Sequence, residues 1–140
     1  MDLALAQQRF AAARVARLAT VGADGRPHIV PVVFAVDAGQ VYLTVDAKPK
    51  STRDLRRLSN IAQTGHVSLL VDEYDDDWTR LWWVRVDGDA VAADADAPDG
   101  RRAIDALVAK YSQYAAERPA GPAVIVTTLR WRSWSYSKVQ

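Results

Sequence analysis

Residues 14–45, RVARLATVGADGRPHIVPVVFAVDAGQVYLTV, decide the fold. Three stretches rich in Val, Ile, Leu, Tyr and Thr, at residues 14–21, 27–36 and 40–45, are typical of β-strands. The sequences GADGRP and DAGQ between them carry Gly and Asp, which suit tight turns. The pattern predicts a three-stranded antiparallel meander.

Helices are predicted on both sides of this meander. The most regular helical periodicity lies in residues 98–117, where apolar side chains recur at i, i+3, i+4 and i+7: Ile104, Leu107, Val108 and Tyr111. A weaker apolar stripe predicts a helix over residues 2–13. A short helix is expected over residues 51–59, with Ser51 or Thr52 as its N-cap.

Three further strands follow the short helix. They are predicted over residues 66–72, over residues 81–94 with a bulge or turn at 87–89, and over residues 123–134. Six strands with helices only at their connections predict a mainly β fold, a closed or nearly closed antiparallel barrel. A chain of 140 residues with 49% hydrophobic content is expected to form one domain over residues 1–140.

Composition excludes several kinds of partner and site. The formal net charge of +1 predicts no general attraction to nucleic acid or to an anionic membrane. Cysteine is absent, so disulfides, thiolate nucleophiles and cysteine metal sites are excluded and a cytoplasmic protein is expected. Arg9, Arg14 and Arg17 interrupt the first helical stretch, which therefore resembles neither a signal peptide nor a membrane span.

The usual catalytic and metal-binding patterns are missing from this sequence. His28 and His66 are far apart and lack metal-ligand spacing, and the acidic run at residues 72–77 lacks the spacing of a calcium loop. No nucleophile elbow, P-loop or dinucleotide fingerprint occurs. We therefore predict no catalytic side chain and no metal ligand, and we expect a cofactor to supply the reactive atoms if the protein is an enzyme.

The stretch TVDAKPKSTRDLRR, residues 44–57, is the strongest candidate site because five cations gather before and within the short helix. Unpaired N–H groups at a helix N-terminus favour anions, so a phosphate cradle is predicted from Lys50, Ser51, Thr52 and Arg53. Lys48 and Arg56 are expected to hold outer negative charge, and Thr44 to offer a hydroxyl or backbone groups to a flat ring. A solvated helix face would show the same charges.

The five tryptophans are Trp78, Trp82, Trp83, Trp131 and Trp134. Trp82 and Trp83 are neighbours, so a regular strand must direct them to opposite faces. Core packing accounts for most of the five, and we expect at least one to lie at the interface of a homodimer.

Four segments carry a family resemblance: residues 17–36, 42–61, 67–90 and the RWRSWS of residues 130–135. Together they resemble the actinobacterial, F420-dependent branch of the pyridoxamine 5′-phosphate oxidase-like superfamily, and the similarity extends from about Arg14 to Trp134. Gln63, Thr64 and Gly65 depart from the pattern, because an Asn-Pro type turn is expected there. Pyridoxamine phosphate oxidation itself is not expected, since the additional C-terminal basic residues of that enzyme are missing.

The resemblance implies a six-stranded antiparallel split β-barrel of the FMN-binding type, forming a homodimer. It implies a flavin or deazaflavin in a groove between the subunits, with the phosphate near the lysine-containing segment after the third strand. Carried over residue by residue, Lys50, Ser51 and Arg53 bind phosphate, and Thr44 and Val45 line the ring. Pro31 and Val32 match the strand region that approaches the ring.

Four functions compete for this sequence. The first is an oxidoreductase that transfers a hydride between coenzyme F420 and a small unsaturated or conjugated organic molecule. The second is an FMN-binding oxidoreductase on the same fold, and the third is a non-catalytic carrier of F420. The fourth, a single-stranded nucleic-acid binder with tryptophan stacking platforms, is disfavoured by the near-neutral charge and the acidic run. Both flavin types offer a ring and a phosphate, but the longer F420 tail would make better use of Lys48, Arg56 and Arg57.

Overall fold

A computed structural model describes residues 1–45 and 52–137 of the chain. In chain order, the elements are α1 (Leu3–Ala12), β1 (Ala16–Val21), β2 (Pro27–Val32), β3 (Ala35–Asp37), β4 (Gln40–Thr44), α2 (Thr52–Gln63), β5 (His66–Glu73), the 3-10 turn η1 (Trp78–Arg80), β6 (Trp82–Ala93), α3 (Pro98–Lys110), α4 (Ser112–Ala116) and β7 (Ala123–Ser135). No helix of the described residues is both long and apolar enough to cross a membrane.

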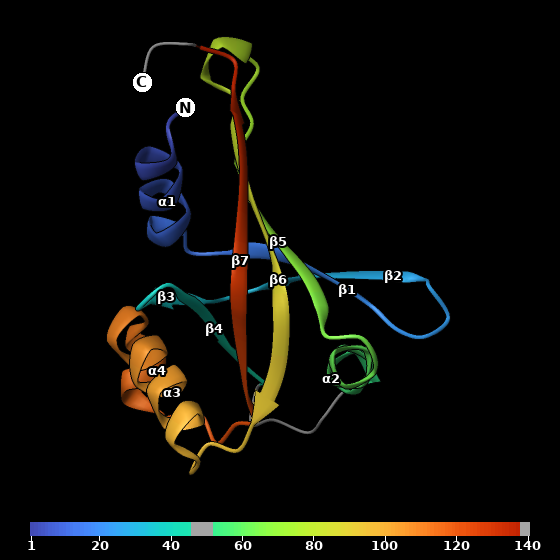
Figure 1. Cartoon of the computed structure of the whole chain (residues 1–140). Coiled ribbons are helices and arrows are strands. Elements are labelled where there is room, and N and C mark those ends of the chain that lie inside the picture. The colour runs from blue at the N-terminus through green and yellow to red at the C-terminus, as the bar shows by residue number, and fades with distance from the viewer. Residues whose placement is uncertain (46–51, 138–140) are drawn as a thin grey trace.

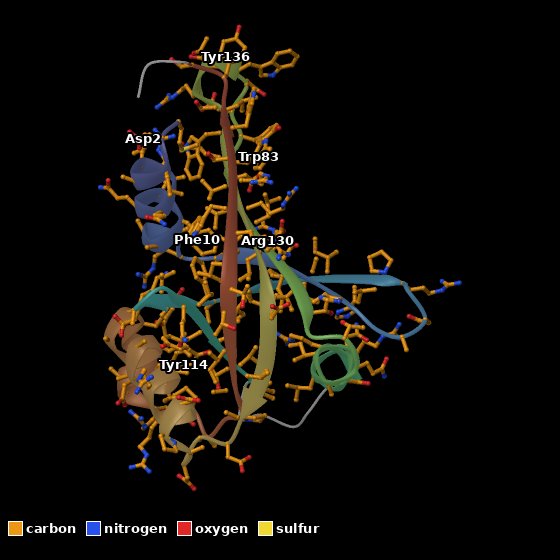
Figure 2. The ribbon with its side chains drawn as sticks, viewed as in Figure 1. Asp2, Phe10, Trp83, Tyr114, Arg130 and Tyr136 are labelled. Carbon is orange, nitrogen blue, oxygen red and sulfur yellow. The ribbon has the colours of Figure 1, made fainter. Side chains whose placement is uncertain are left out.

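All strands belong to one curled antiparallel sheet with the order β2-β1-β5-β6-β7-β4-β3 (Figure 1). The main core lies on its concave side, where alternate residues of β1, β5, β6 and β7 meet. Helix α1 closes this core through Phe10, whose ring lies 4.8 Å from that of Phe34 and 5.4 Å from that of Trp131 (Figure 2). The mainly β, curled antiparallel fold confirms the predicted class.

The described residues form seven strands rather than the predicted six. The expected single strand over residues 27–36 is two strands, since the chain leaves β1 after Val32 and joins β4 from Ala35 onward. Phe34 lies between them, fully buried. Its N–H donates to the hydroxyl of Tyr111 at 3.1 Å and is therefore not available for a hydrogen bond to a neighbouring strand. A tertiary contact thus divides the sequence pattern into two strands.

Tyr111 also divides the predicted helix over residues 98–117. Its φ of −117° and ψ of 120° are extended, so α3 ends at Lys110 and α4 begins at Ser112. The extended conformation lets the ring reach the core, where the side chain is 6% exposed. The hydroxyl lies 2.9 Å from the carbonyl oxygens of both Arg14 and Phe34, which share its single proton. One side chain thus connects the end of α3 to the segments before β1 and before β3.

The other local predictions agree with the structure apart from one boundary. The short helix α2 continues to Gln63 instead of ending at residue 59. The register between β6 and β7 shifts between Asp87 and Asp89, which confirms the bulge. A Cβ at Gly88 would lie 2.7 Å from the carbonyl oxygen of Thr127, so only glycine fits there. Trp82 packs against the core and Trp83 lies on the outer face, which confirms that the two indoles point in opposite directions.

We expect Tyr111→Phe to lower the free energy of unfolding by about 1–3 kcal/mol, because the buried N–H of Phe34 loses its acceptor. Urea unfolding followed by circular dichroism measures this change. Tyr74→Phe is the matched control: its ring is 68% exposed, and its effect should stay within about 0.5 kcal/mol. Equal effects of the two substitutions would contradict the role given to the Tyr111 hydroxyl.

Candidate functional site

The predicted site lies where β4 ends and α2 begins. Val45 is buried, and its N–H donates to the carbonyl oxygen of Pro122 at 3.0 Å. The Thr44 hydroxyl donates to the same oxygen at 3.2 Å. The connection after α4 therefore fixes the end of β4, and the Thr44 hydroxyl is already used within the protein.

The predicted phosphate cradle is described in part. Lys48, Lys50 and Ser51 lie outside the described residues. Thr52 and Arg53 form the start of α2, where the first backbone N–H groups have no acceptor within the helix. The helix therefore begins where the capping signals in the sequence place it.

Arg56 extends from α2 toward the turn between β1 and β2. Its guanidinium lies 3.6 Å from the carboxylate of Asp24, and both side chains are about half exposed. An ion pair so exposed contributes little to stability. Arg56 is therefore held beside the β1–β2 turn but remains accessible to an anion in solvent.

Helix α2 is attached to the β1–β2 hairpin by polar side chains. Gln63 Oε1 accepts from the N–H of Ala23 at 2.7 Å, and the Thr64 hydroxyl donates to the carbonyl oxygen of Val21 at 2.7 Å. Gln63 and Thr64, which stand where the resemblance leads one to expect an Asn-Pro type turn, thus hold the helix against the hairpin. Gly22 allows this close approach, since a Cβ there would lie 2.6 Å from Asn60 Oδ1.

Asn60 and Thr20 form a buried polar pair that is not among the residues predicted from the sequence. Asn60 Nδ2 donates to the Thr20 hydroxyl at 3.1 Å, and both residues are 3% exposed. The sequence carried one indication of this pair: Asn60 stands next to the apolar Ile61 in an amphipathic helix. Burial of a polar side chain is favourable only when it is hydrogen-bonded, so the pair fixes α2 in one position on β1.

His28 lies beside this pair on the concave side of β2. It is paired with Thr20 across the β1–β2 ladder and shares a strand face with Val30. Its Nδ1 is shielded from solvent and has no hydrogen-bond partner among the described residues. An unpartnered ring nitrogen next to α2 can exchange a hydrogen bond or a proton with a bound molecule.

Pro31 and Val32 do not share an environment. Pro31 is exposed, whereas Val32 is buried in the core and has no side-chain surface for a ring. Both belong to β2, at one edge of the sheet, while β4 lies next to the other edge. Hydrogen bonds among the described residues thus join α2 to the β1–β2 hairpin and join Thr44 and Val45 to Pro122, but none of them joins Pro31 to Thr44.

The outer face of the sheet carries apolar side chains. A groove of about 440 Å³ crosses β1, β2, β5 and β6, and Ile29, Leu70 and Trp83 line it together with Arg17 and Arg85. Ile29 is 64% exposed in the single chain. Such a surface is typical of a protein association site.

The polar groups of α2 and the β1–β2 hairpin suit an anionic ligand. The helix start offers backbone N–H groups, Arg56 offers a guanidinium, and His28 offers an unpartnered nitrogen. Burial raises the pKa of Tyr42, whose hydroxyl donates to Gln40 Oε1. Tyr42 packs against α3, so it lies apart from this arrangement.

Known proteins match this chain over different lengths. A solved conserved hypothetical protein of Mycobacterium tuberculosis superimposes with a TM-score of 0.71 at 25% identity, over 99% of this chain and 88% of the other. A FAD-binding protein from Mesorhizobium loti gives a TM-score of 0.67 at 22% identity, over 96% of each chain. The second likeness shows the shared fold alone.

A curated relative matches part of the chain. It is the 5a,11a-dehydrotetracycline/5a,11a-dehydrooxytetracycline reductase of Streptomyces rimosus, with 39% identity over 57 residues. This match covers 41% of the present chain and 39% of the reductase. The family model described as pyridoxamine 5′-phosphate oxidase matches residues 4–138. Since that match includes every strand of the curled sheet and both sides of the β4–α2 connection, the chain belongs to the pyridoxamine 5′-phosphate oxidase family.

Proposed function

We propose that this protein is an oxidoreductase that uses coenzyme F420 to transfer a hydride to or from a small unsaturated or conjugated organic molecule. The observation that carries the proposal is the β4–α2 connection: a helix start directly after a cation-rich segment, with β4 and the β1–β2 turn fixed on either side. The family match and the partial likeness to a reductase support redox chemistry.

In this proposal, the phosphate binds at the start of α2. Lys50, Ser51, Thr52 and Arg53 supply its donors, which act together with the positive end of the helix. Lys48 and Arg56 hold the negative groups of the tail. Arg56 keeps its place through the ion pair with Asp24, and that exposed contact can yield to a stronger anion.

The ring lies along the end of β4, against Thr44 and Val45. Because the Thr44 hydroxyl donates to Pro122, this region meets a ring through backbone groups and methyl surface. Pro31 and Val32 are proposed to approach the ring from β2 of the second subunit. Val32 would contribute its backbone, because its side chain is buried.

When bound, the deazaflavin supplies or accepts the hydride. The protein holds donor and acceptor in line, at about 3–3.5 Å, and needs no nucleophile. His28 can hold the accompanying proton at Nδ1, which is shielded from water and unpartnered among the described residues. These roles require positioning and exclusion of water, in keeping with the lack of a catalytic constellation in the sequence.

An FMN-dependent oxidoreductase is the second candidate, and a non-catalytic F420 carrier remains a further one. The FAD-binding neighbour supports a true flavin on this fold. The cation-rich segment favours F420, because one phosphate would occupy only part of it. Turnover of a conjugated enone with reduced F420 separates a catalyst from a carrier.

We expect Lys50→Ala to weaken F420 binding about tenfold or more, because a charge-assisted bond to phosphate is worth roughly 1.5–3 kcal/mol. Tryptophan quenching during cofactor titration measures the affinity. Arg101→Ala is the control, since this arginine is exposed and belongs to α3, and Figure 1 shows α3 and α2 on opposite sides of β6 and β7. Unchanged affinity in Lys50→Ala would place the phosphate elsewhere.

F420 should bind more tightly than FMN, and its advantage should shrink as salt rises, because exposed charges are screened over about 8–10 Å at physiological ionic strength. Parallel titrations at low and high salt measure both effects. If FMN binds tightly and independently of salt, and F420 fails to displace it, the FMN assignment replaces the present one.

We further propose a homodimer that pairs the outer sheet faces around Ile29 and Trp83. Light scattering at micromolar concentration should give twice the chain mass, and Ile29→Asp should give a monomer because it places a charge in an apolar interface. Leu3→Asp, at an exposed position of α1, should leave the protein dimeric. A monomeric parent that retains full cofactor affinity would exclude a site shared between subunits.

A further inference from the structure

A second groove lies between α3 and β3, away from the cofactor site. Figure 1 shows α3 and α2 on opposite sides of the β6–β7 pair. The groove encloses about 940 Å³. Its apolar lining consists mainly of small side chains, which leave room for a ligand: Ala11, Ala35, Val36, Ala106 and Ala109. The family resemblance and the proposed redox function assign nothing to this groove.

Lys110 stands at one end of the groove as a half-buried cation. Its Nζ donates to the carbonyl oxygen of Ala13 at 2.6 Å and lies 4.0 Å from the centre of the Phe34 ring. The ion pairs found among the described residues do not include Lys110. Burial, together with the nearby charge of Arg14, lowers the pKa of Lys110 to about 8. The ammonium group thus lacks an anionic partner.

The acidic residues near the groove do not supply this partner. Asp105 is engaged by Arg118, 2.6 Å away, on the exposed side of α3. Asp37, on β3, is exposed and lines the wall of the groove. Arg101 and Arg102 add positive charge to the lining, and Arg102 forms an ion pair with Asp99 at 3.8 Å and a hydrogen bond with Tyr42. Positive charge therefore exceeds negative charge along the lining.

The helical spacing places these cations at two ends of one apolar strip. Arg102 and Lys110 are eight residues apart on α3, a separation of about 12 Å along the helix axis at 1.5 Å per residue. Ala106 and Ala109 lie between them on the groove side. A ligand on this strip would contact methyl groups along its body and a cation at its end.

We propose that this groove binds an amphipathic carboxylate, with the carboxylate at Lys110 Nζ and a flat apolar body on the alanine strip between α3 and β3. The bound anion neutralises an ammonium that is partly removed from water, and the apolar body covers the alanine surface. Pockets of this size are usual for small-molecule ligands.

The proposal also sets the direction of a pH dependence. Protonated Lys110 attracts the carboxylate, so affinity should fall as pH rises through about 8, and the bound anion should raise that pKa. Tyr111 stays neutral in this range because burial raises its pKa. The charged group nearest the amine is Arg14, beyond α1, and the other charged groups of the groove are Asp37 on β3 and Arg101, Arg102 and Asp105 on α3.

The test is a titration of the isotopically labelled full chain with 2-naphthoate, followed by amide chemical shifts. Shifts are expected in residues 35–37 and 101–110. Lys110→Met should weaken binding at least about tenfold, and Ala106→Trp, which keeps the lysine but fills the strip, should abolish it. The neutral 2-naphthalenemethanol should bind less tightly than 2-naphthoate.

Several outcomes would overturn the proposal. These are shifts confined to the outer face of β5 and β6, no shifts at all, or equal affinity in the parent and Ala106→Trp. Should Lys110→Met fail to fold, the Ala106→Trp variant and the pH dependence of 2-naphthoate affinity still test the proposal. F420 affinity should remain unchanged in Ala106→Trp, so failure at this groove and failure at the cofactor site are separate results.

Discussion

The Tyr111 hydroxyl makes the contacts on which much of the architecture depends. One atom accepts from the N–H of Phe34 and lies within hydrogen-bond distance of the carbonyl oxygens of Phe34 and Arg14. These groups belong to the link between β2 and β3 and to the segment before β1. The chain can therefore leave one edge of the sheet and enter the other without buried, unpaired backbone groups. The same contact ends α3 and turns the chain into α4.

Two further polar attachments set the candidate site. The carbonyl oxygen of Pro122 holds the end of β4, and Asn60, Gln63 and Thr64 hold α2 against the β1–β2 hairpin. Both ends of the cation-rich segment are thus fixed to the sheet. Under the proposed function, attachment at both ends lowers the conformational entropy lost on ligand binding, which favours affinity.

Local signals in the sequence were sufficient for several parts of this fold. The start of α2 followed from a Ser-Thr cap, and the β6 bulge from Asp87, Gly88 and Asp89.

No local signal in the sequence indicates that residues 27–36 form two strands or that the helix breaks at Tyr111. Neither stretch has a helix or strand breaker at the division. Both divisions depend instead on a hydrogen bond between residues 77 positions apart, Phe34 and Tyr111. The attachment of Thr44 to Pro122 is equally remote in sequence, at 78 positions. Such contacts depend on tertiary structure, which overrides local propensity.

The two edges of the sheet affect how this protein resists aggregation. Edge strands expose hydrogen-bonding groups on which another chain can add a strand. Here β3, at one edge, has only three residues. At the other edge, β2 contains Pro27 and Pro31, which alternate with Ile29 along one side of the strand and have no N–H to donate. Ile29, midway between the two prolines, retains its N–H on that side. A foreign strand would therefore find few donors on β2 and little length on β3, and stable association is directed to the faces of the sheet.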